Sequence, residues 1–384
     1  MAPESPQHPF RVLIVGGSVG ALEAALALRD HAGDVVATTL LAPDPDFVMR
    51  PERVREPFGY GVAKTYPLDE IARDIGVDLI QDTFEWLDPG ARVVHTGGDQ
   101  EIEYDALLLA LGARLYPRFK NALTIDDRRI DEQMHGLIQD LEGGYLHKLV
   151  FVSPSTMPWP LPIYELALMT ARRAFDMDIE MSITIATPED SPLAIFGTTA
   201  SETVEKLLEE HGILTITSAH CEVPEPGRVS IHPGERWLHA DRVVALPQLV
   251  GPSTPGVPKS SPEGFIGVDP TGKVHGLERV YAVGDATDFP VKMGAIAAQQ
   301  ADTAAAAIAA LAGLEVAPVP FKPVVQAILL GAEKPLYLKA HITGGHGSSS
   351  EATETPGDAP RSKIAAKYLA PYLDARDRVA GSAS

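Results

Sequence analysis

Apolar runs alternate with helix-forming stretches along most of the chain, a pattern typical of α/β proteins. Near the N-terminal end, an apolar run at 11–15 leads through a glycine-rich turn into a helix-forming stretch at 21–29, and a second apolar run follows at 35–41. Strands that are apolar along their whole length are typical of parallel sheets, because both faces of such sheets are buried. The segment therefore predicts a strand, a tight turn, a helix and a second parallel strand.

Short alternating stretches follow between 77 and 111, separated by turn residues at 88–90 (Asp-Pro-Gly) and 97–99 (Gly-Gly-Asp). This pattern predicts a small antiparallel meander. The apolar stretch 105–111 then predicts a buried strand that ends at Gly112.

A second series of helices and strands is predicted between 131 and 217, and buried strands return at 241–246 and 280–283 before an alanine-rich helix at 295–311. We divide the chain into a first domain formed by 10–115 and 241–318, an inserted domain at 116–240 and a C-terminal region at 319–384. In that last region, 344–362 is predicted to be a flexible linker and 363–373 a short amphipathic helix.

The turn at 16–21 reads Gly-Gly-Ser-Val-Gly-Ala and lies between a predicted strand and a predicted helix. Residues without bulk at this place let backbone N–H groups at the helix N-terminus approach a pyrophosphate. Ser18 stands where the dinucleotide fingerprint has its middle glycine, and Ala21 stands at its last position. The alternative interpretation is a structural turn that binds nothing.

An acidic residue for the ribose hydroxyls is expected at the end of the second strand, where Ala42 stands. Asp44 lies two residues further on, between Pro43 and Pro45. Asp44 either reaches the ribose or is a turn residue, in which case the adenosine end is held differently.

The stretch 280–285 (Val-Tyr-Ala-Val-Gly-Asp) places the carboxylate of Asp285 at the end of a buried strand, where it can accept a hydrogen bond from a ribityl hydroxyl. Pyridine nucleotides have no ribityl chain. Together with the turn at 16–21 and the strand that ends at 110–112, this stretch resembles the three-part pattern of the FAD-dependent pyridine nucleotide-disulfide oxidoreductase superfamily. The segments 47–51 and 290–302 are similar to its sulfide:quinone oxidoreductase and type II NADH dehydrogenase branch, and the resemblance covers roughly residues 10–340.

This resemblance implies an α/β fold with two Rossmann-like dinucleotide-binding domains and a bound FAD. It places Lys292 near the pyrimidine end of the flavin, where its charge would stabilise the anionic reduced form; a solvated surface lysine is the alternative. The cofactor-binding residues predicted in this way are Gly16, Gly17, Ser18, Val19, Gly20, Ala21, Ala42, Asp44, Arg50, Pro51, Ala110, Leu111, Gly112, Gly284, Asp285, Lys292, Met293, Gly294 and Ala295.

The inserted domain departs from the pattern of an NADH dehydrogenase. Where a second glycine fingerprint is expected, 153–165 carries four prolines and Trp159. Proline lacks the N–H groups that would cradle a phosphate, so a pyridine nucleotide has no evident binding site. The stretch 157–164 either walls a substrate or quinone pocket over the flavin, with Trp159 and Tyr164 as catalytic candidates beside Lys292, or closes a degenerate site with Trp159 in the core.

Composition excludes several classes of chemistry. Cys221 is the only cysteine, so the chain has no intramolecular disulfide, no redox-active cysteine pair and no thiolate metal cluster, and Cys221 itself is expected to be inert in a loop after a strand. The flavin-side cysteines of sulfide oxidation, which the resemblance implies, are missing. The histidines show no metal-ligand spacing.

The charge balance of 32 basic against 52 acidic residues disfavours nucleic acid or an anionic membrane surface as a partner. No apolar signal-peptide core or membrane-spanning run occurs, which predicts a cytoplasmic protein. The resemblance favours membrane attachment through the C-terminal helix. The surrounding acidic residues favour its docking on a second subunit or a protein partner instead.

We therefore expect an FAD-dependent oxidoreductase that does not use NAD(P)H at a conventional second site and that passes electrons between an unidentified donor and a quinone-like or protein acceptor. An NAD(P)H-dependent flavin reductase is the first alternative. A flavin-binding sensor or scaffold without turnover is the second.

Overall fold

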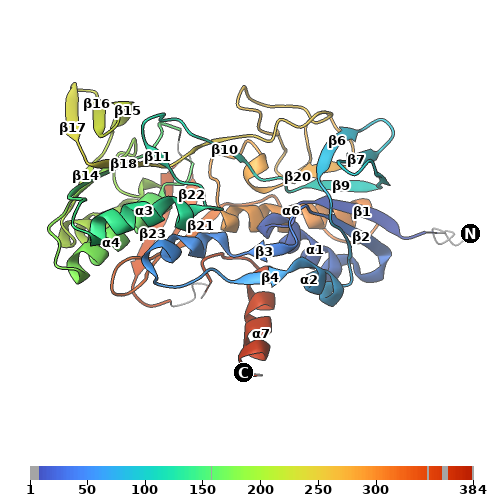
Figure 1. The fold of residues 1–384 in the computed structure, drawn as a ribbon. Coiled ribbons are helices and arrows are strands. Elements are labelled where there is room, and N and C mark those ends of the chain that lie inside the picture. Colours follow the sequence, from blue (N-terminus) through green and yellow to red (C-terminus); the bar gives the residue numbers. More distant parts are fainter. Residues whose placement is uncertain (1–7, 157, 344–345, 357–361, 383–384) are drawn as a thin grey trace, which may run out of the picture.

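The computed structural model describes residues 8–156, 158–343, 346–356 and 362–382. Two five-stranded sheets form its centre, one in each half of the view in Figure 1, and each is parallel throughout. The α/β class with parallel sheets that the sequence predicts is confirmed.

The first sheet has the strand order β20 (Val280–Ala282), β9 (Ala106–Leu109), β1 (Phe10–Val15), β2 (Val36–Leu41) and β5 (Asp78–Ile80). Alternate side chains of β1 enter two separate cores. Val12 and Ile14 pack with helices α1 (Val19–Ala32) and α6 (Gly294–Leu311). Leu13 and Val15 pack on the opposite face. Burial on both faces explains why this strand is apolar at successive positions.

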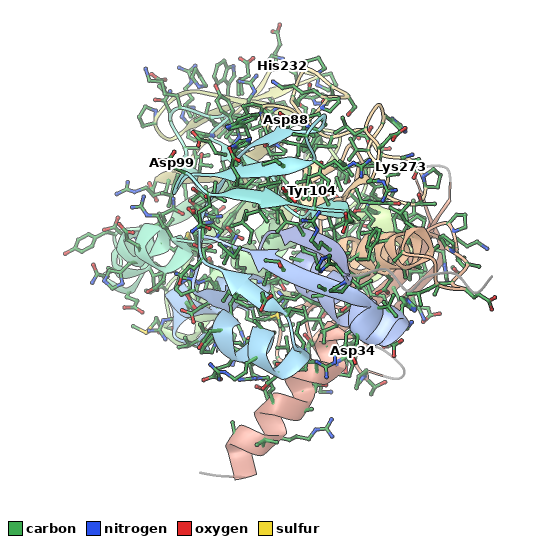
Figure 2. The ribbon with its side chains drawn as sticks, turned by 90° about the vertical axis from the view of Figure 1, so that its right-hand side faces the viewer. Asp34, Asp88, Asp99, Tyr104, His232 and Lys273 are labelled. Atoms are coloured by element: carbon green, nitrogen blue, oxygen red, sulfur yellow. The ribbon has the colours of Figure 1, made fainter. Side chains whose placement is uncertain are left out.

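An antiparallel meander covers that opposite face, and it consists of β6 (Phe84–Asp88), β7 (Val93–Thr96) and β8 (Glu101–Glu103). Its turns lie where the sequence predicted them, as the positions of Asp88 and Asp99 in Figure 2 show. The Asp88 carboxylate accepts hydrogen bonds from the amides of Gly90 and Ala91, which closes the first turn. Tyr104 follows the last strand and is buried beneath the meander.

The second sheet has the order β11 (Leu123–Thr124), β18 (Arg242–Ala245), β12 (Lys148–Val152), β13 (Ser182–Ala186) and β14 (Ile213–Ile216). The helices α3 (Ile130–Glu142), α4 (Leu161–Asp176) and α5 (Thr198–Glu210) share one core with it. A second meander, which the sequence did not predict, covers the other face with β15 (His220–Glu225), β16 (Arg228–His232) and β17 (Arg236–His239). Cys221 therefore lies in strand β15, not in the loop expected.

The chain passes between the two halves through a pair of antiparallel strands, β10 (Arg114–Tyr116) and β19 (Gln248–Val250). Because β18 pairs with β12 in the second sheet, the return to the first domain comes after Ala245 rather than at the predicted boundary of 241. Between β2 and β5 lie β3 (Asp46–Val48), β4 (Thr65–Pro67) and α2 (Leu68–Ile75).

The C-terminal region differs from its prediction. An antiparallel sheet of β21 (Val324–Leu329), β22 (Leu336–Thr343) and β23 (His346–Thr353) includes a strand inside the expected linker, of which residues 344–345 and 357–361 lie outside the described residues. The polar strand β23 is held by pairing with β22 and by a 2.9 Å hydrogen bond from the Ala200 amide to the Ser350 hydroxyl. The last helix, α7 (Leu369–Ser382), starts later than expected and points away from the body in Figure 1.

Among the described helices, none combines the length and the hydropathy needed to cross a membrane.

Candidate functional site

The glycine turn after β1 is tightly enclosed. Gly16 has a φ of +129°, and a Cβ added there would lie 2.4 Å from the carbonyl oxygen of Ala110. A Cβ on Gly17 would lie 2.8 Å from Leu68, and one on Gly20 would lie 3.1 Å from Val283. Larger residues at these three positions would push α1 away from the strands beside it.

The N-terminus of α1 is open to a ligand. Ser18 is exposed and caps the helix without a side-chain hydrogen bond, and the first turn contains no acidic residue. Val19 and Ala21 are buried and contribute packing and backbone N–H groups only. Free N–H groups at a helix N-terminus favour an anion such as a pyrophosphate, and the exposure of Ser18 explains how a serine fits in place of the middle glycine.

The predicted adenosine end lies beyond β2. Ala42 is fully buried, and its amide donates to the carbonyl of Ile80 over 3.0 Å. Asp44 is exposed, with its carboxylate 3.7 Å from the guanidinium of Arg50. Arg50 and the exposed Pro51 begin a 3₁₀ segment, Arg50–Phe58. Asp44 is thus accessible at the rim of the site, as either interpretation of it requires.

The segment after β9 lies beside the glycine turn. The amide of Ala110 donates to the carbonyl of Val15 over 2.8 Å, and Ala110 closely approaches Gly16. Leu111 and Gly112 are partly exposed, and Gly112 has a φ of +69° that suits a glycine.

Asp285 presents its carboxyl at the end of β20. Gly284, with a φ of +72°, is fixed by a 2.7 Å hydrogen bond from its amide to the side chain of Gln300. Asp285 is partly exposed, and in the described part of the chain its carboxylate accepts no hydrogen bond. Loss of water raises the pKa of Asp285 to about 6, although the charge of Lys292 opposes this shift. A carboxyl that is desolvated but unpaired within the protein fits a ligand that donates a hydrogen bond.

Lys292 is buried, with 5% of its surface exposed, so the solvated surface lysine is ruled out. Its ammonium donates to the carbonyl of Thr287 and lies 4.2 Å from the centre of the Phe265 ring. Burial lowers the pKa of Lys292 to about 8, against the attraction of Asp285 and Asp288.

The residues that follow Lys292 lead directly into α6. Met293 caps the helix without a side-chain hydrogen bond, and its first turn, which begins with Gly294 and the buried Ala295, has no acidic residue. A second uncapped helix N-terminus therefore lies next to Lys292.

Asp127, on the loop before α3, was not identified from the sequence. Its carboxyl interacts electrostatically with Asp285 and with Arg50. Loss of water around this carboxyl raises its pKa, and the charge of Arg50 opposes the shift. The inserted domain thus adds an acid next to the site, but 126–129 (Asp-Asp-Arg-Arg) looks like an ordinary polar turn in the sequence.

In the second sheet, the corresponding edge is filled by the protein itself. Glu189 follows β13, at the place where a nucleotide-binding domain has its acidic residue for ribose. Its carboxylate accepts hydrogen bonds from the hydroxyls of Tyr164, over 2.7 Å, and Thr187, over 2.9 Å. Burial raises the pKa of Glu189 to about 7.

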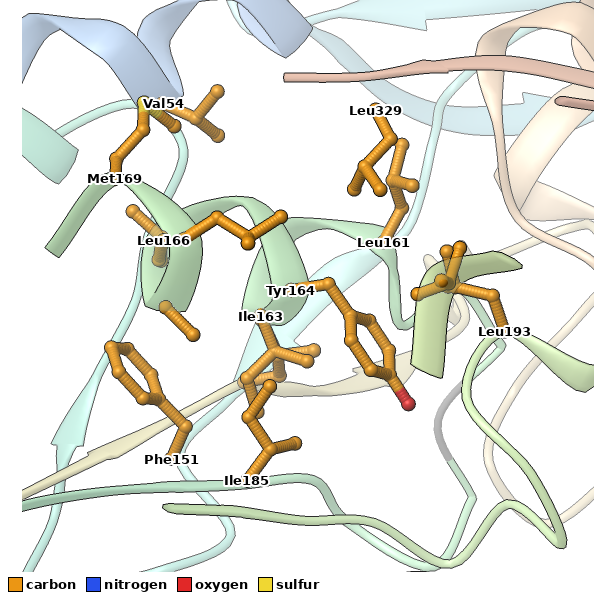
Figure 3. Packing of buried hydrophobic residues seen from close by; sticks show 14 of the residues in the cluster. Val54, Phe151, Leu161, Ile163, Tyr164, Leu166, Met169, Ile185, Leu193 and Leu329 are labelled. Carbon is orange, nitrogen blue, oxygen red and sulfur yellow. The ribbon is translucent and has the colours of Figure 1, made fainter. Parts of the chain in front are cut away.

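Tyr164 is fully buried, with its ring among apolar side chains that include Leu161, Ile163 and Leu193 (Figure 3). It therefore cannot contact a substrate, and we replace its predicted catalytic role with a structural one. Trp159 is partly buried and packs edge-on against Phe196 at 5.8 Å between ring centres, which favours the core interpretation of Trp159. Met157 lies outside the described residues.

The apolar residues of the C-terminal end pack on their own chain. Ile364, Leu369 and Leu373 are buried in the core that contains α1 and α2. These three side chains are covered by their own chain, whereas Tyr368 and Tyr372 are partly exposed, so docking of the C-terminal helix on another protein stays a prediction.

Comparisons with known proteins bear on the fold as a whole. No protein-family model matches the chain. It is 24% identical over 255 residues to the sulfide-quinone reductase of Aquifex aeolicus (strain VF5), a match that spans 63% of this chain and 59% of that relative, less than two thirds of its length.

Among solved structures, the sulfide:quinone oxidoreductase of Aquifex aeolicus superposes with a TM-score of 0.78 at 20% identity, covering 90% of this chain and 87% of that one. An NAD-dependent persulfide reductase from A. fulgidus superposes with a TM-score of 0.63 at 18% identity, covering 88% of this chain and 65% of that one. A ferredoxin reductase from Rhodopseudomonas palustris superposes with a TM-score of 0.66 at 18% identity, covering 87% of this chain and 83% of that one. The chain is thus similar in sequence to a sulfide-quinone reductase and shares the fold of these solved oxidoreductases.

Proposed function

We propose that the protein is an oxidoreductase that binds FAD noncovalently in its first domain. The observation that carries this proposal is the unpaired, desolvated carboxyl of Asp285 at the same sheet edge as the uncapped N-terminus of α1. The α1 amides would hold the pyrophosphate and Asp285 a ribityl hydroxyl. A bound FAD supplies hydride and single-electron transfer.

The charges of this chain would tune that chemistry. Lys292 has a lowered pKa of about 8 and stands next to the uncapped start of α6. A positive charge and a helix N-terminus both favour negative charge that develops on a nearby ring. These two features support the role of Lys292 at the pyrimidine end of the flavin.

We propose that the electron donor is not NAD(P)H bound at the second sheet. Glu189 is already engaged by Tyr164 and Thr187, and the loop before α4 has prolines where phosphate-binding amides are needed. The persulfide reductase of similar fold is described as NAD-dependent, so the fold alone does not decide this question. The local chemistry of the loop and of Glu189 supports the proposal.

Sulfide is also disfavoured as the donor, although the curated relative is a sulfide-quinone reductase. Cys221 is the only cysteine, and it packs beneath the second sheet in β15. Burial raises the pKa of its thiol to about 12, so it carries almost no thiolate at neutral pH.

For the acceptor, we propose a quinone-like molecule or a redox protein. The similar structures include a sulfide:quinone oxidoreductase and a covalent putidaredoxin reductase–putidaredoxin complex. We further propose that the protein is cytoplasmic.

The test begins with the visible spectrum of the purified protein, before and after added FAD. The protein is then mixed anaerobically with NADH or NADPH while the flavin absorbance is followed, with dithionite as the positive control for reduction. We expect a flavin spectrum, no reduction within the first second at sub-millimolar nucleotide, and reoxidation of the dithionite-reduced protein by a soluble quinone or a ferredoxin.

A colourless protein that takes up no FAD would overturn the proposal. Rapid reduction by NADH or NADPH would establish the flavin reductase alternative, and a bound flavin that no acceptor reoxidises would establish the sensor or scaffold.

A further inference from the structure

Residues 362–369, a segment with several bends that leads into α7 and is here called the C-terminal strap, connect parts of the chain that are far apart in sequence. The ammonium of Lys363 lies 2.6 and 2.8 Å from the two carboxylate oxygens of Glu165 and donates to the carbonyl of Pro51 over 3.1 Å. Glu165 also accepts the amide of Leu330 over 2.9 Å. Lys363 therefore joins α4 of the inserted domain, the end of β21 and the loop after β3.

The strap also touches two elements of the proposed FAD site. Ile364 is 3% exposed, and a Cβ added to Gly294 at the start of α6 would lie 3.3 Å from its side chain. Glu23 of α1 is fully buried and accepts the amides of Lys367, Tyr368 and Leu369 over 2.6–2.9 Å. The strap thus contacts the loop at Pro51, the start of α6 and the helix that follows the glycine turn.

Burial of both Glu165 and Lys363 costs free energy, because both charges lose their contact with water. The two side chains are 1% and 6% exposed, and a buried ion pair stabilises a fold only where its geometry is good and its remaining hydrogen bonds are made. Replacement of such a pair by two apolar residues is often neutral for stability. The hydrogen bond from Lys363 to Pro51 is not replaced when the ion pair is exchanged for two apolar residues. Its loss would free the loop at Pro51.

We propose that Lys363 is a positioning residue for the flavin, which holds the loop at Arg50 and Pro51 in place from the C-terminal strap. The inference rests on the proposed binding of FAD. Loss of Lys363 would release this loop on one side of the site while the glycine turn and Asp285 remain intact.

The experiment compares three variants with the wild-type protein. Lys363→Met breaks the ion pair and the bond to Pro51. The double variant Glu165→Met/Lys363→Met removes the unpaired buried charge but still lacks the donor to Pro51. Lys334→Met is the matched control, because Lys334 forms a 3.1 Å ion pair with Glu354 in which both side chains are at least 65% exposed.

FAD affinity is measured by the quenching of flavin fluorescence, and hydrogen exchange of the 3₁₀ segment Arg50–Phe58 is measured on the FAD-free protein. For the double variant we expect wild-type far-UV circular dichroism, faster exchange in Arg50–Phe58, and about tenfold weaker FAD binding, because the released segment must be ordered again when FAD binds. Lys363→Met should show both changes and a lower unfolding temperature, and Lys334→Met should show none.

A folded double variant that binds FAD like the wild type, with unchanged exchange, would show that Lys363 is structural only. Failure of the wild-type protein itself to bind FAD would instead overturn the proposed function, and the exchange measurement would still decide whether Lys363 holds the loop.

Discussion

Replacement of Asp285 by asparagine should have opposite effects on the FAD-free and FAD-bound protein. Transfer into the fold raises the pKa of Asp285 from 3.8 to about 6, and this value includes the attraction of Lys292. A carboxyl with a raised pKa destabilises the fold when it is ionised. This cost is absent below about pH 3.8, grows as the pH rises towards 6 and is constant above it.

The difference between these two pKa values corresponds to about 3 kcal/mol at most, and water at the partly exposed carboxyl reduces it. The asparagine side chain cannot ionise, so Asp285→Asn should stabilise the FAD-free protein by up to this amount at pH 7 and hardly at all at pH 4. In the FAD complex, the same substitution removes a charge-assisted hydrogen bond worth about 1.5–3 kcal/mol, which corresponds to roughly 10- to 100-fold weaker FAD binding.

Urea unfolding of the FAD-free wild type and variant at pH 4, 5, 6 and 7 tests the first effect, and FAD titration at pH 7 tests the second. Lys292 stays mostly protonated over this range, because its pKa is about 8. Asp285→Ala, which also lacks the side-chain amide of the asparagine variant, serves as a second variant for FAD retention. A variant that is less stable than the wild type at pH 7 would refute the argument from the raised pKa, and one that binds FAD equally well would refute the assignment of Asp285 as the ribityl ligand.

The remaining predictions concern Lys292, Cys221 and the C-terminal strap. Lys292→Met should lower the midpoint potential of the bound flavin by about 30 mV or more, since 1.4 kcal/mol corresponds to about 30 mV for a two-electron couple, and an unchanged potential in a dye-linked titration would contradict its electrostatic role. The thiol of Cys221, with a pKa of about 12, should react with a thiol reagent at pH 7 only after urea is added, and Cys221→Ser should leave flavin reduction unchanged; prompt labelling of the native protein would argue against this burial. Truncation after Thr343 leaves Glu23 and Glu165 without their strap partners, at about 3–5 kcal/mol for a broken buried pair, so the unfolding temperature should fall sharply while co-sedimentation with anionic vesicles stays low for both forms. Strong vesicle binding by the full-length protein that truncation abolishes would restore the membrane-attached alternative.

The elements of the two parallel sheets could be predicted because local pattern and burial agree there. The predicted strand at 148–152 matches β12, and the alanine-rich helix at 295–311 matches α6 within one residue. Both are apolar at nearly every position, because each lies between two buried layers. The two turns of the first meander could be predicted as well, because aspartate and glycine at these positions favour turns, and the Asp88 carboxylate accepts the amide of Gly90.

The parts that could not be predicted depend on long-range pairing. Strand β23 is polar and rich in serine, so its sequence looks like a linker until β22 lies beside it. Glu23 and Glu165 are acidic residues within helices, and nothing in their neighbourhood predicts that a strap 198 to 346 residues away will cover them. Tyr164 was predicted to line a pocket for the same reason. Its hydrogen-bond partner, Glu189, lies 25 residues further on, after β13, so the sequence around Tyr164 does not reveal the pair.

The two sheets provide an internal comparison of where a dinucleotide could bind. Each sheet has helices on one face and an antiparallel meander on the other. The first keeps its glycine turn, and within the described residues the Asp285 carboxylate at its carboxyl edge accepts no hydrogen bond. The second has prolines in place of the turn and satisfies its acid, Glu189, from within.

A hydroxyl of bound ribose would share the Glu189 carboxylate with Tyr164 and Thr187, which both donate to its Oε2. These existing bonds, with the prolines before α4, support the proposal that a pyridine nucleotide does not bind at the second sheet. Under the proposed function, an electron donor would then approach the first domain, where Arg50 and the Asp127 carboxyl of the inserted domain interact electrostatically.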